Sequence, residues 1–144
     1  MTVYAVTSAT VGAAAPKTSV QIVAAANARV KILGFVIGDE AATTAQGVAW
    51  ELNRQTTAGT SSAQTPVPLD IDAIASRTTA LSTFTAEPTA GTIVFQCGFD
   101  RIGTYIFWFP PGKEPVIANS GRIGLRKITG ADTDIWRVTV FFDE

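Results

Sequence analysis

Hydrophobic and polar residues alternate along most of the chain from Val20 onward, in runs of the length that β-strands have. In residues 48–55, the clearest run, Val48, Trp50 and Leu52 fall on one side and polar residues occupy the other. Because successive side chains of a strand point to opposite faces, this period of two predicts a strand with one buried face. The same pattern predicts strands at residues 20–24, 29–37, 80–85, 92–99, 104–109, 121–128 and 135–142.

The segments between these runs are rich in Gly, Pro, Asn and Asp, which favour turns. Residues 56–68 form a long polar segment, and we expect a loop there that is free to contact a partner. Residues 70–76 begin with an Asp that suits a helix N-cap, and they predict a single helical turn. Pro115 restricts a short strand at residues 115–118 to the margin of a sheet.

About eight strands without an amphipathic helix predict an all-β fold, in which two antiparallel sheets pack as a β-sandwich. Long, variable connections favour a jelly roll over an immunoglobulin-like arrangement. Residues 20–144 are expected to form this single domain, because a chain of 144 residues can bury a core without disulfides or metals. Residues 1–19 have two interpretations: an ordinary first strand, or an N-terminal arm that pairs with the sheet edge of a neighbouring subunit.

The chain combines little net charge with an excess of apolar residues. Its 11 basic and 12 acidic residues give a net charge of −1, without the basic field that a nucleic acid or an anionic membrane requires in a partner. Hydrophobic residues make up 47% of the chain and charged residues 16%, so we expect partner subunits to cover part of the surface. The sequence shows neither a secretion signal nor an apolar stretch of about 20 residues, which predicts synthesis in the cytoplasm.

Few residues offer catalytic chemistry. The chain has no histidine, which removes Ser-His-Asp and Cys-His nucleophiles and histidine metal sites. The acidic pairs Asp70 with Asp72 and Asp132 with Asp134 lack the further ligands of a calcium loop, and we interpret them as turn or cap residues. The sequence therefore predicts a protein that is not an enzyme, with no catalytic, cofactor or metal residues, although a carboxylate-based hydrolase stays open.

The aromatic residues and Cys97 fit core positions better than ligand sites. Trp50 and Trp136 lie on apolar faces of predicted strands, where packing is the expected role. Cys97 alternates with Ile93, Phe95 and Phe99, and no histidine can activate it, so it is interpreted as a small core residue. Residues 105–109 are apolar on both faces, and so is the pair Phe141 and Phe142, which predicts that one ring of each segment needs cover from outside the core.

Four segments carry a resemblance to small virion proteins of tailed phages and prophages: ELNRQTTAGT at residues 51–60, AEPTAG at 86–91, EPVI at 114–117 and GRIGLR at 121–126. These motifs are loop and strand segments, not a catalytic signature. In size and strand pattern the chain also resembles the jelly-roll decoration, or cement, proteins of phage capsids. The likeness spans most of the chain from Ala25 onward.

The resemblance implies a structural role on the virion. A decoration protein binds the outside of the head and bridges subunits of the major capsid protein, and many copies add their buried area together. A homotrimer is then expected in preference to a homodimer, and the alternative function is a tail, fibre or receptor-binding module that binds glycan. The residues expected at interfaces are Val3 and Tyr4 in the arm, Thr57, Ala58, Gly59 and Thr60 in the polar loop, and Trp108 with Phe109.

Overall fold

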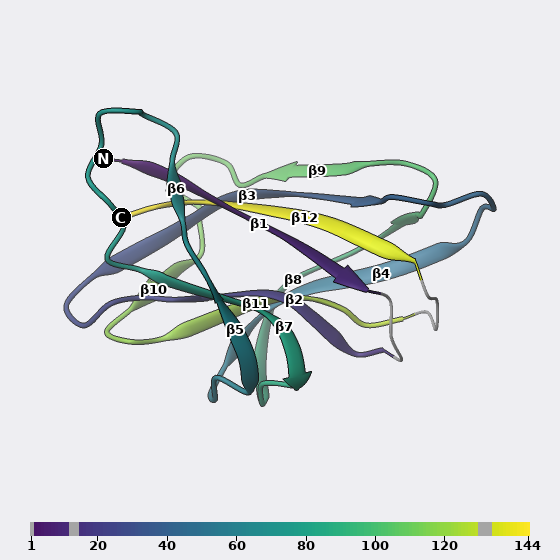
Figure 1. Ribbon diagram of the computed structural model, residues 1–144, viewed down its shortest axis with the longest axis horizontal. Coiled ribbons are helices and arrows are strands. Elements are labelled where there is room, and N and C mark those ends of the chain that lie inside the picture. The colour runs from purple at the N-terminus through teal and green to yellow at the C-terminus, as the bar shows by residue number, and fades with distance from the viewer. Residues whose placement is uncertain (1, 12–14, 130–133) are drawn as a thin grey trace.

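The computed structural model describes residues 2–11, 15–129 and 134–144, and it confirms the all-β fold class and the antiparallel β-sandwich. Two sheets of six strands lie one above the other in Figure 1. Across the described ranges no helix is long and apolar enough to cross a bilayer. The jelly-roll topology stays a prediction.

Sheet A contains the short strands at both of its edges and three long strands between them. Its order is β10 (Val116–Ala118), β3 (Arg29–Asp39), β12 (Ile135–Asp143), β1 (Val3–Val11) and β6 (Val67–Pro68), and β9 (Tyr105–Trp108) also pairs with β3. Sheet B has the order β5 (Thr60–Gln64), β7 (Thr79–Ala86), β2 (Lys17–Val23), β11 (Arg122–Lys127), β4 (Gly47–Gln55) and β8 (Ala90–Asp100).

The chain passes from sheet B to sheet A along both sides of the sandwich. On one side β5, the edge of sheet B, continues through Thr65 and Pro66 into β6, the edge of sheet A. On the other side β8 continues through a short turn into β9. Each pair of edges is therefore joined by a short stretch of chain, which keeps the edges of the two sheets close together.

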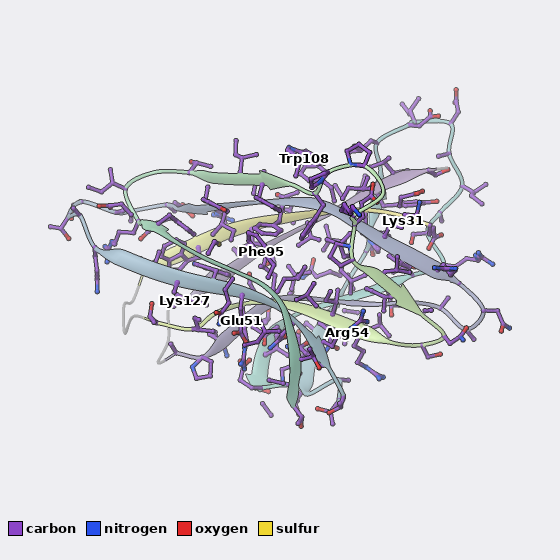
Figure 2. The ribbon with its side chains drawn as sticks, turned by 180° about the vertical axis from the view of Figure 1, so that it is seen from behind. Lys31, Glu51, Arg54, Phe95, Trp108 and Lys127 are labelled. Carbon is purple, nitrogen blue, oxygen red and sulfur yellow. The ribbon has the colours of Figure 1, made fainter. Side chains whose placement is uncertain are left out.

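The core lies between the sheets and is rich in aromatic rings. Trp50 of sheet B and Trp136 of sheet A are fully buried and meet edge to face at 5.5 Å between centroids, which confirms their predicted core role. A second aromatic cluster surrounds Phe35, and Figure 2 shows its member Phe95 in the space between the sheets. Each such buried side chain contributes about 2–3 kcal/mol to folding through removal of apolar surface from water.

The N-terminal segment is an ordinary first strand, and the structure thus supports that one of the two interpretations. β1 pairs with β12 in continuous antiparallel register from Val3 opposite Asp143 to Val11 opposite Ile135, and β6 lies on its other side. Tyr4 is 1% exposed and stacks on Phe142 in the core. The Tyr4 ring is therefore buried within the chain, and an interface contact of this residue stays a prediction.

Two sequence predictions need correction. The segment 56–68, expected as a loop, contains β5 and β6, because its Thr and Ser residues pair with β7 and its Val67 pairs with β1. Residues 70–76 form a turn without a helix: the Asp70 carboxylate accepts a hydrogen bond from the amide of Asp72, and the Asp70 carbonyl accepts one from Ala73.

A bulge in β8 changes the face to which Ile93 belongs. Leu52 of β4 pairs with Phe95 and Asn53 pairs with Ile93, so Val94 is an extra residue in the ladder. Phe95, Cys97 and Phe99 face the core as expected, whereas Ile93 turns to the outer face of sheet B. Bulges of this kind also protect an edge strand from pairing with another chain.

Candidate interaction face

The outer face of sheet A, the face turned away from the core, carries an apolar row that runs across five strands. The register places Trp108 of β9 beside Gly34 of β3, Gly34 beside Phe141 of β12, Phe141 beside Ala5 of β1, and Ala5 beside Val67 of β6. Strands lie about 4.8 Å apart, so the row is about 19 Å long. This row and the adjacent Ile106 and Val36 make up the apolar part of the outer face of sheet A.

Trp108 lies flat on its own sheet and leaves half of its surface to solvent. A Cβ atom on Gly34 would come within 2.7 Å of the Trp108 ring, which shows that the indole covers this glycine. The ring also contacts Phe141 at a centroid distance of 4.9 Å. Trp108 remains 51% exposed and Ile106 59% exposed. The solvent-facing side of an antiparallel sheet normally carries polar residues, so these apolar side chains are unusual there.

As predicted, one ring of each flagged segment turns away from the core. Phe142 is buried in the core, and Phe141 points to the outer face and meets Trp108. Phe107 and Phe109 turn inward and join the aromatic cluster around Phe35. Trp108 is the residue of this strand whose exposed ring has no cover within the described chain.

A second apolar feature lies beyond the β6 edge of the same sheet. Residues 69–74, which we call the 69–74 knob, belong to the loop that follows β6 and projects beside the end of β12 in Figure 1. Leu69 is 60% exposed, Ile71 95% and Ile74 75%. Asp70 and Asp72 alternate with these residues and are also exposed. The knob therefore presents three large apolar side chains and two carboxylates to solvent.

The knob is held in place by hydrogen bonds from both ends. The amide of Leu69 donates to the carbonyl of Val3 at 2.9 Å, and the Tyr4 hydroxyl donates to the carbonyl of Ile74 at 3.0 Å. At the far end the Glu144 carboxylate accepts hydrogen bonds from the amides of Arg77 and Thr78 and from the hydroxyls of Ser76 and Thr78. A loop fixed so fully while its isoleucines stay exposed is organised in advance for contact.

The electrostatics of Glu144 agree with this clamp. Burial alone would raise its pKa, but the hydrogen bonds from Thr78, Arg77 and Ser76 outweigh burial and hold the pKa of Glu144 below its ordinary value of 4.5. The carboxylate is therefore charged at neutral pH and accepts its hydrogen bonds fully.

The outer face of sheet B has the reverse character. Glu51, Asn53 and Gln21 point away from the core and yet are at most 2% exposed. The Glu51 carboxylate accepts hydrogen bonds from Arg126 Nε at 2.5 Å, Asn53 Nδ2 at 2.9 Å and Gln96 Nε2 at 3.0 Å. These neighbours, together with the loop at Thr57, cover the polar side chains. Figure 2 shows Glu51 on this lower layer.

A second group of hydrogen bonds on this face joins Gln21 of β2 to Gln55 of β4 across β11. Gln21 Nε2 donates to Gln55 Oε1 at 2.6 Å and to the carbonyl of Thr57 at 3.0 Å. The Gln55 amide lies directly over Gly124, where a Cβ atom would come within 2.4 Å of it. Gln21 Oε1 and Asn53 Oδ1 have no hydrogen-bond partner among the described residues. Most of this polar face is therefore satisfied within the chain.

The acidic residues brought together at one end of the sandwich form an ion-pair network. Arg101 contacts Asp39 at 3.4 Å and also pairs with Asp134, and it donates to the Gln46 side chain at 3.1 Å. Burial raises the pKa of Asp39, with a smaller contribution from the charge of Asp134. Because one guanidinium holds both carboxylates, this arrangement favours a structural role over a hydrolytic pair. Asp132, the other half of the predicted pair, lies outside the described residues.

No cluster of metal-binding side chains forms within the described ranges. Asp70 acts as a turn residue, as its hydrogen bond to Asp72 shows. Cys97 packs against the core opposite Trp50, and burial raises the pKa of its thiol, which makes the reactive thiolate harder to form.

The predicted interface residues are not brought together by the fold. Trp108 lies on the outer face of sheet A, Val3 lies beside the knob at a shallow depression shared with Leu69, and Phe109 turns inward. Thr57, Ala58 and Gly59 lie in the loop between β4 and β5, and Thr60 begins β5 of sheet B. In this loop Thr57 bonds to Thr89, and Gly59 (φ 65°) packs against the Ala86 carbonyl. Sequence reasoning missed the knob, although isolated apolar residues between aspartates at positions 69–74 were a visible signal.

Comparison with known proteins adds no family: no protein-family model, no curated protein and no solved structure matches the chain.

Proposed function

We propose that this protein is a structural assembly protein, and specifically a decoration protein of a tailed-phage capsid. Copies would bind the outside of the head, bridge subunits of the major capsid protein and stabilise the shell without catalysis. The protein would be made in the host cytoplasm and would reside on the capsid surface. The jelly-roll topology also belongs to this proposal, because it rests on the long connections between the strands and on the resemblance in strand pattern.

The observation that carries the proposal is the outer face of sheet A. This face carries an apolar row across five strands, and its Trp108, Ile106 and Val67 are each more than half exposed, which suits association. The net charge of −1 lets many copies lie side by side on a lattice without strong repulsion.

The test is co-sedimentation of the purified protein with expanded phage heads that lack decoration. We expect saturable binding at a fixed ratio to the major capsid protein, and weaker binding by a Trp108→Ser variant. Ile93→Ser is the matched control, since Ile93 is 50% exposed but lies on sheet B. Absence of binding by the unchanged protein overturns the capsid proposal.

The exposed aromatic pair Trp108 and Phe141 favours a second candidate, a glycan-binding tail or fibre module. A sugar ring stacks on such a platform. Titration with host-type oligosaccharides should then quench tryptophan fluorescence in the unchanged protein and not in Trp108→Phe, because Trp50 and Trp136 are buried. Unquenched fluorescence across a broad glycan panel rules against this candidate.

A further inference from the structure

The knob and the Trp108 end of the outer face lie at opposite edges of sheet A. The knob follows β6, and Trp108 belongs to β9, on the far side of β3, β12 and β1. Four strand spacings separate these edges, a distance of about 19 Å. The two features therefore do not meet within one chain, and each is left exposed.

The two features are both apolar and carry opposite charges. At the knob, Ile71 and Ile74 are accompanied by the exposed carboxylates of Asp70 and Asp72. At the face, Trp108 is accompanied by Lys31 and Arg29, which are exposed on β3 while their neighbours Val30 and Ile32 are buried. Figure 2 shows Lys31 and Trp108 in the same quarter of the molecule.

Lys31 lies opposite Asp143 of β12 in the sheet register, but the charges of the two features make no close ion pair in the described part of the chain. No ion pair joins Arg29, Lys31, Asp70 or Asp72 to an opposite charge in the described ranges. Lys31 lies in register with Val116, three positions along β3 from the Gly34 that Trp108 covers, a spacing of about 10 Å. A knob seated on Trp108 would bring its aspartates within reach of these cations.

We infer that the 69–74 knob of one copy docks on the Trp108 end of the outer face of sheet A in a second copy of this chain. Because knob and face are different surfaces, the contact is head-to-tail, and such contacts close into a ring when the rotation between copies allows it. Each copy in a ring then makes two contacts, which multiplies the stability of the assembly. The clamp on Glu144 presets the knob, so little order is lost on docking.

This inference is independent of the capsid. It concerns contacts between copies in free solution, and a ring that fails to bind heads would overturn the decoration proposal alone. Conversely, single copies that bind heads would overturn the ring and leave decoration standing.

The experiment is the mass in solution of the full chain and of three variants, by light scattering and sedimentation velocity. The unchanged chain should have three or more times the single-chain mass of 15.1 kDa. The knob variant (Ile71→Asp with Ile74→Asp) and the face variant (Trp108→Asp) should each associate at least about thirtyfold more weakly, the loss typical of a central interface residue. Ile93→Asp, an exposed isoleucine outside both features, is the control and should assemble normally.

Mixing the two defective variants separates this contact from other modes of association. The intact knob of the face variant can dock on the intact face of the knob variant, so the mixture should form one-to-one pairs while each alone stays monomeric. If Trp108 instead packed against Trp108 of a second copy, the knob variant alone would still dimerise, and this would overturn the inference. A monomeric unchanged chain would overturn it as well.

A charge exchange tests the orientation without removing apolar surface. Lys31→Glu and Asp72→Lys should each weaken association about three- to tenfold, and the two changes together should restore most of it. Circular dichroism of each variant checks that the sandwich is folded. If the losses of association free energy caused by Lys31→Glu and Asp72→Lys simply add in the double variant, the result would contradict contact between Lys31 and Asp72.

Discussion

On the outer face of sheet B, Glu51, Asn53 and Gln21 are polar and yet buried, whereas on the outer face of sheet A, Trp108 and Ile106 are apolar and more than half exposed. Both faces come from strands with the same period of two. Sheet B covers its polar residues with their own hydrogen-bond partners, such as Arg126 and Gln96 on Glu51. Sheet A has only Gly34 and Phe141 beneath its tryptophan. The difference shows that the polar residues on the outer face of sheet B are largely covered within the chain, whereas Trp108 and Ile106 on the outer face of sheet A are not.

The largest expected effect comes from breaking the polar network of sheet B. Glu51→Ala removes the acceptor for Arg126, Asn53 and Gln96, and it leaves a partly buried guanidinium without its carboxylate. We expect the free energy of unfolding to fall by about 3–5 kcal/mol. Urea unfolding followed by fluorescence measures this, with Thr7→Ala on the exposed outer side of sheet A as the control. A loss below about 1 kcal/mol would show that the network adds little.

Each outer face has a central glycine under a side chain, which allows a paired test. Gly34→Ala places Cβ within 2.4 Å of the backbone oxygen of Phe107, so β9 must shift, and we expect a loss of about 2–3 kcal/mol. In Gly124→Ala the obstacle is the side chain of Gln55, which can move at the expense of its hydrogen bonds to Gln21 and Thr18, and we expect about 1–2 kcal/mol. A larger loss at Gly124 in urea unfolding would reverse this ranking.

A smaller effect is expected at the clamp of the knob. Glu144→Gln replaces a charged acceptor facing the amides of Arg77 and Thr78, and we expect a loss of about 1 kcal/mol together with faster amide exchange at these two residues. Because the pKa of Glu144 is lowered in the folded state, its contribution is fully present above the ordinary value of 4.5 and is lost as the pH falls through the lower folded value. If the protection of the Arg77 amide, measured relative to its intrinsic exchange rate at each pH, did not fall as the pH is lowered, the result would argue against the clamp.

The smallest effect on stability is expected at Trp108. Trp108→Ser removes a ring that is 51% exposed, so the unfolding free energy of the isolated chain should change by less than about 1 kcal/mol. The variant should also lose the tryptophan emission that acrylamide quenches most readily, since Trp50 and Trp136 are buried. A large loss of stability would mean that the ring serves the fold of sheet A more than its surface.

Local pattern sufficed for the strands and for the two core tryptophans. Alternation predicted β4, β7 and β12 close to their observed bounds, because a strand with one apolar face buries that face whatever its neighbours are. It also showed that one of Phe141 and Phe142 must turn outward.

Exposure of the outer faces could not be predicted from local pattern. Glu51 is dry because Arg126 and Gln96, on two other strands, reach it, and such pairing depends on register across the sheet. The extra residue at Val94 moved Ile93 to the other face, and a bulge leaves no mark in the alternation. The knob was missed because the same segment, which begins with an aspartate, also fits a capped helical turn.

The apolar row of sheet A draws its residues from nearly the full length of the described chain, from Ala5 in β1 to Phe141 in β12. During synthesis the early strands cannot display this row, since β1 pairs with a strand that emerges more than a hundred residues later. Nascent chains on neighbouring ribosomes therefore lack the surface by which finished copies would recognise one another. The order of strands thus keeps this row unformed until the last strand has emerged.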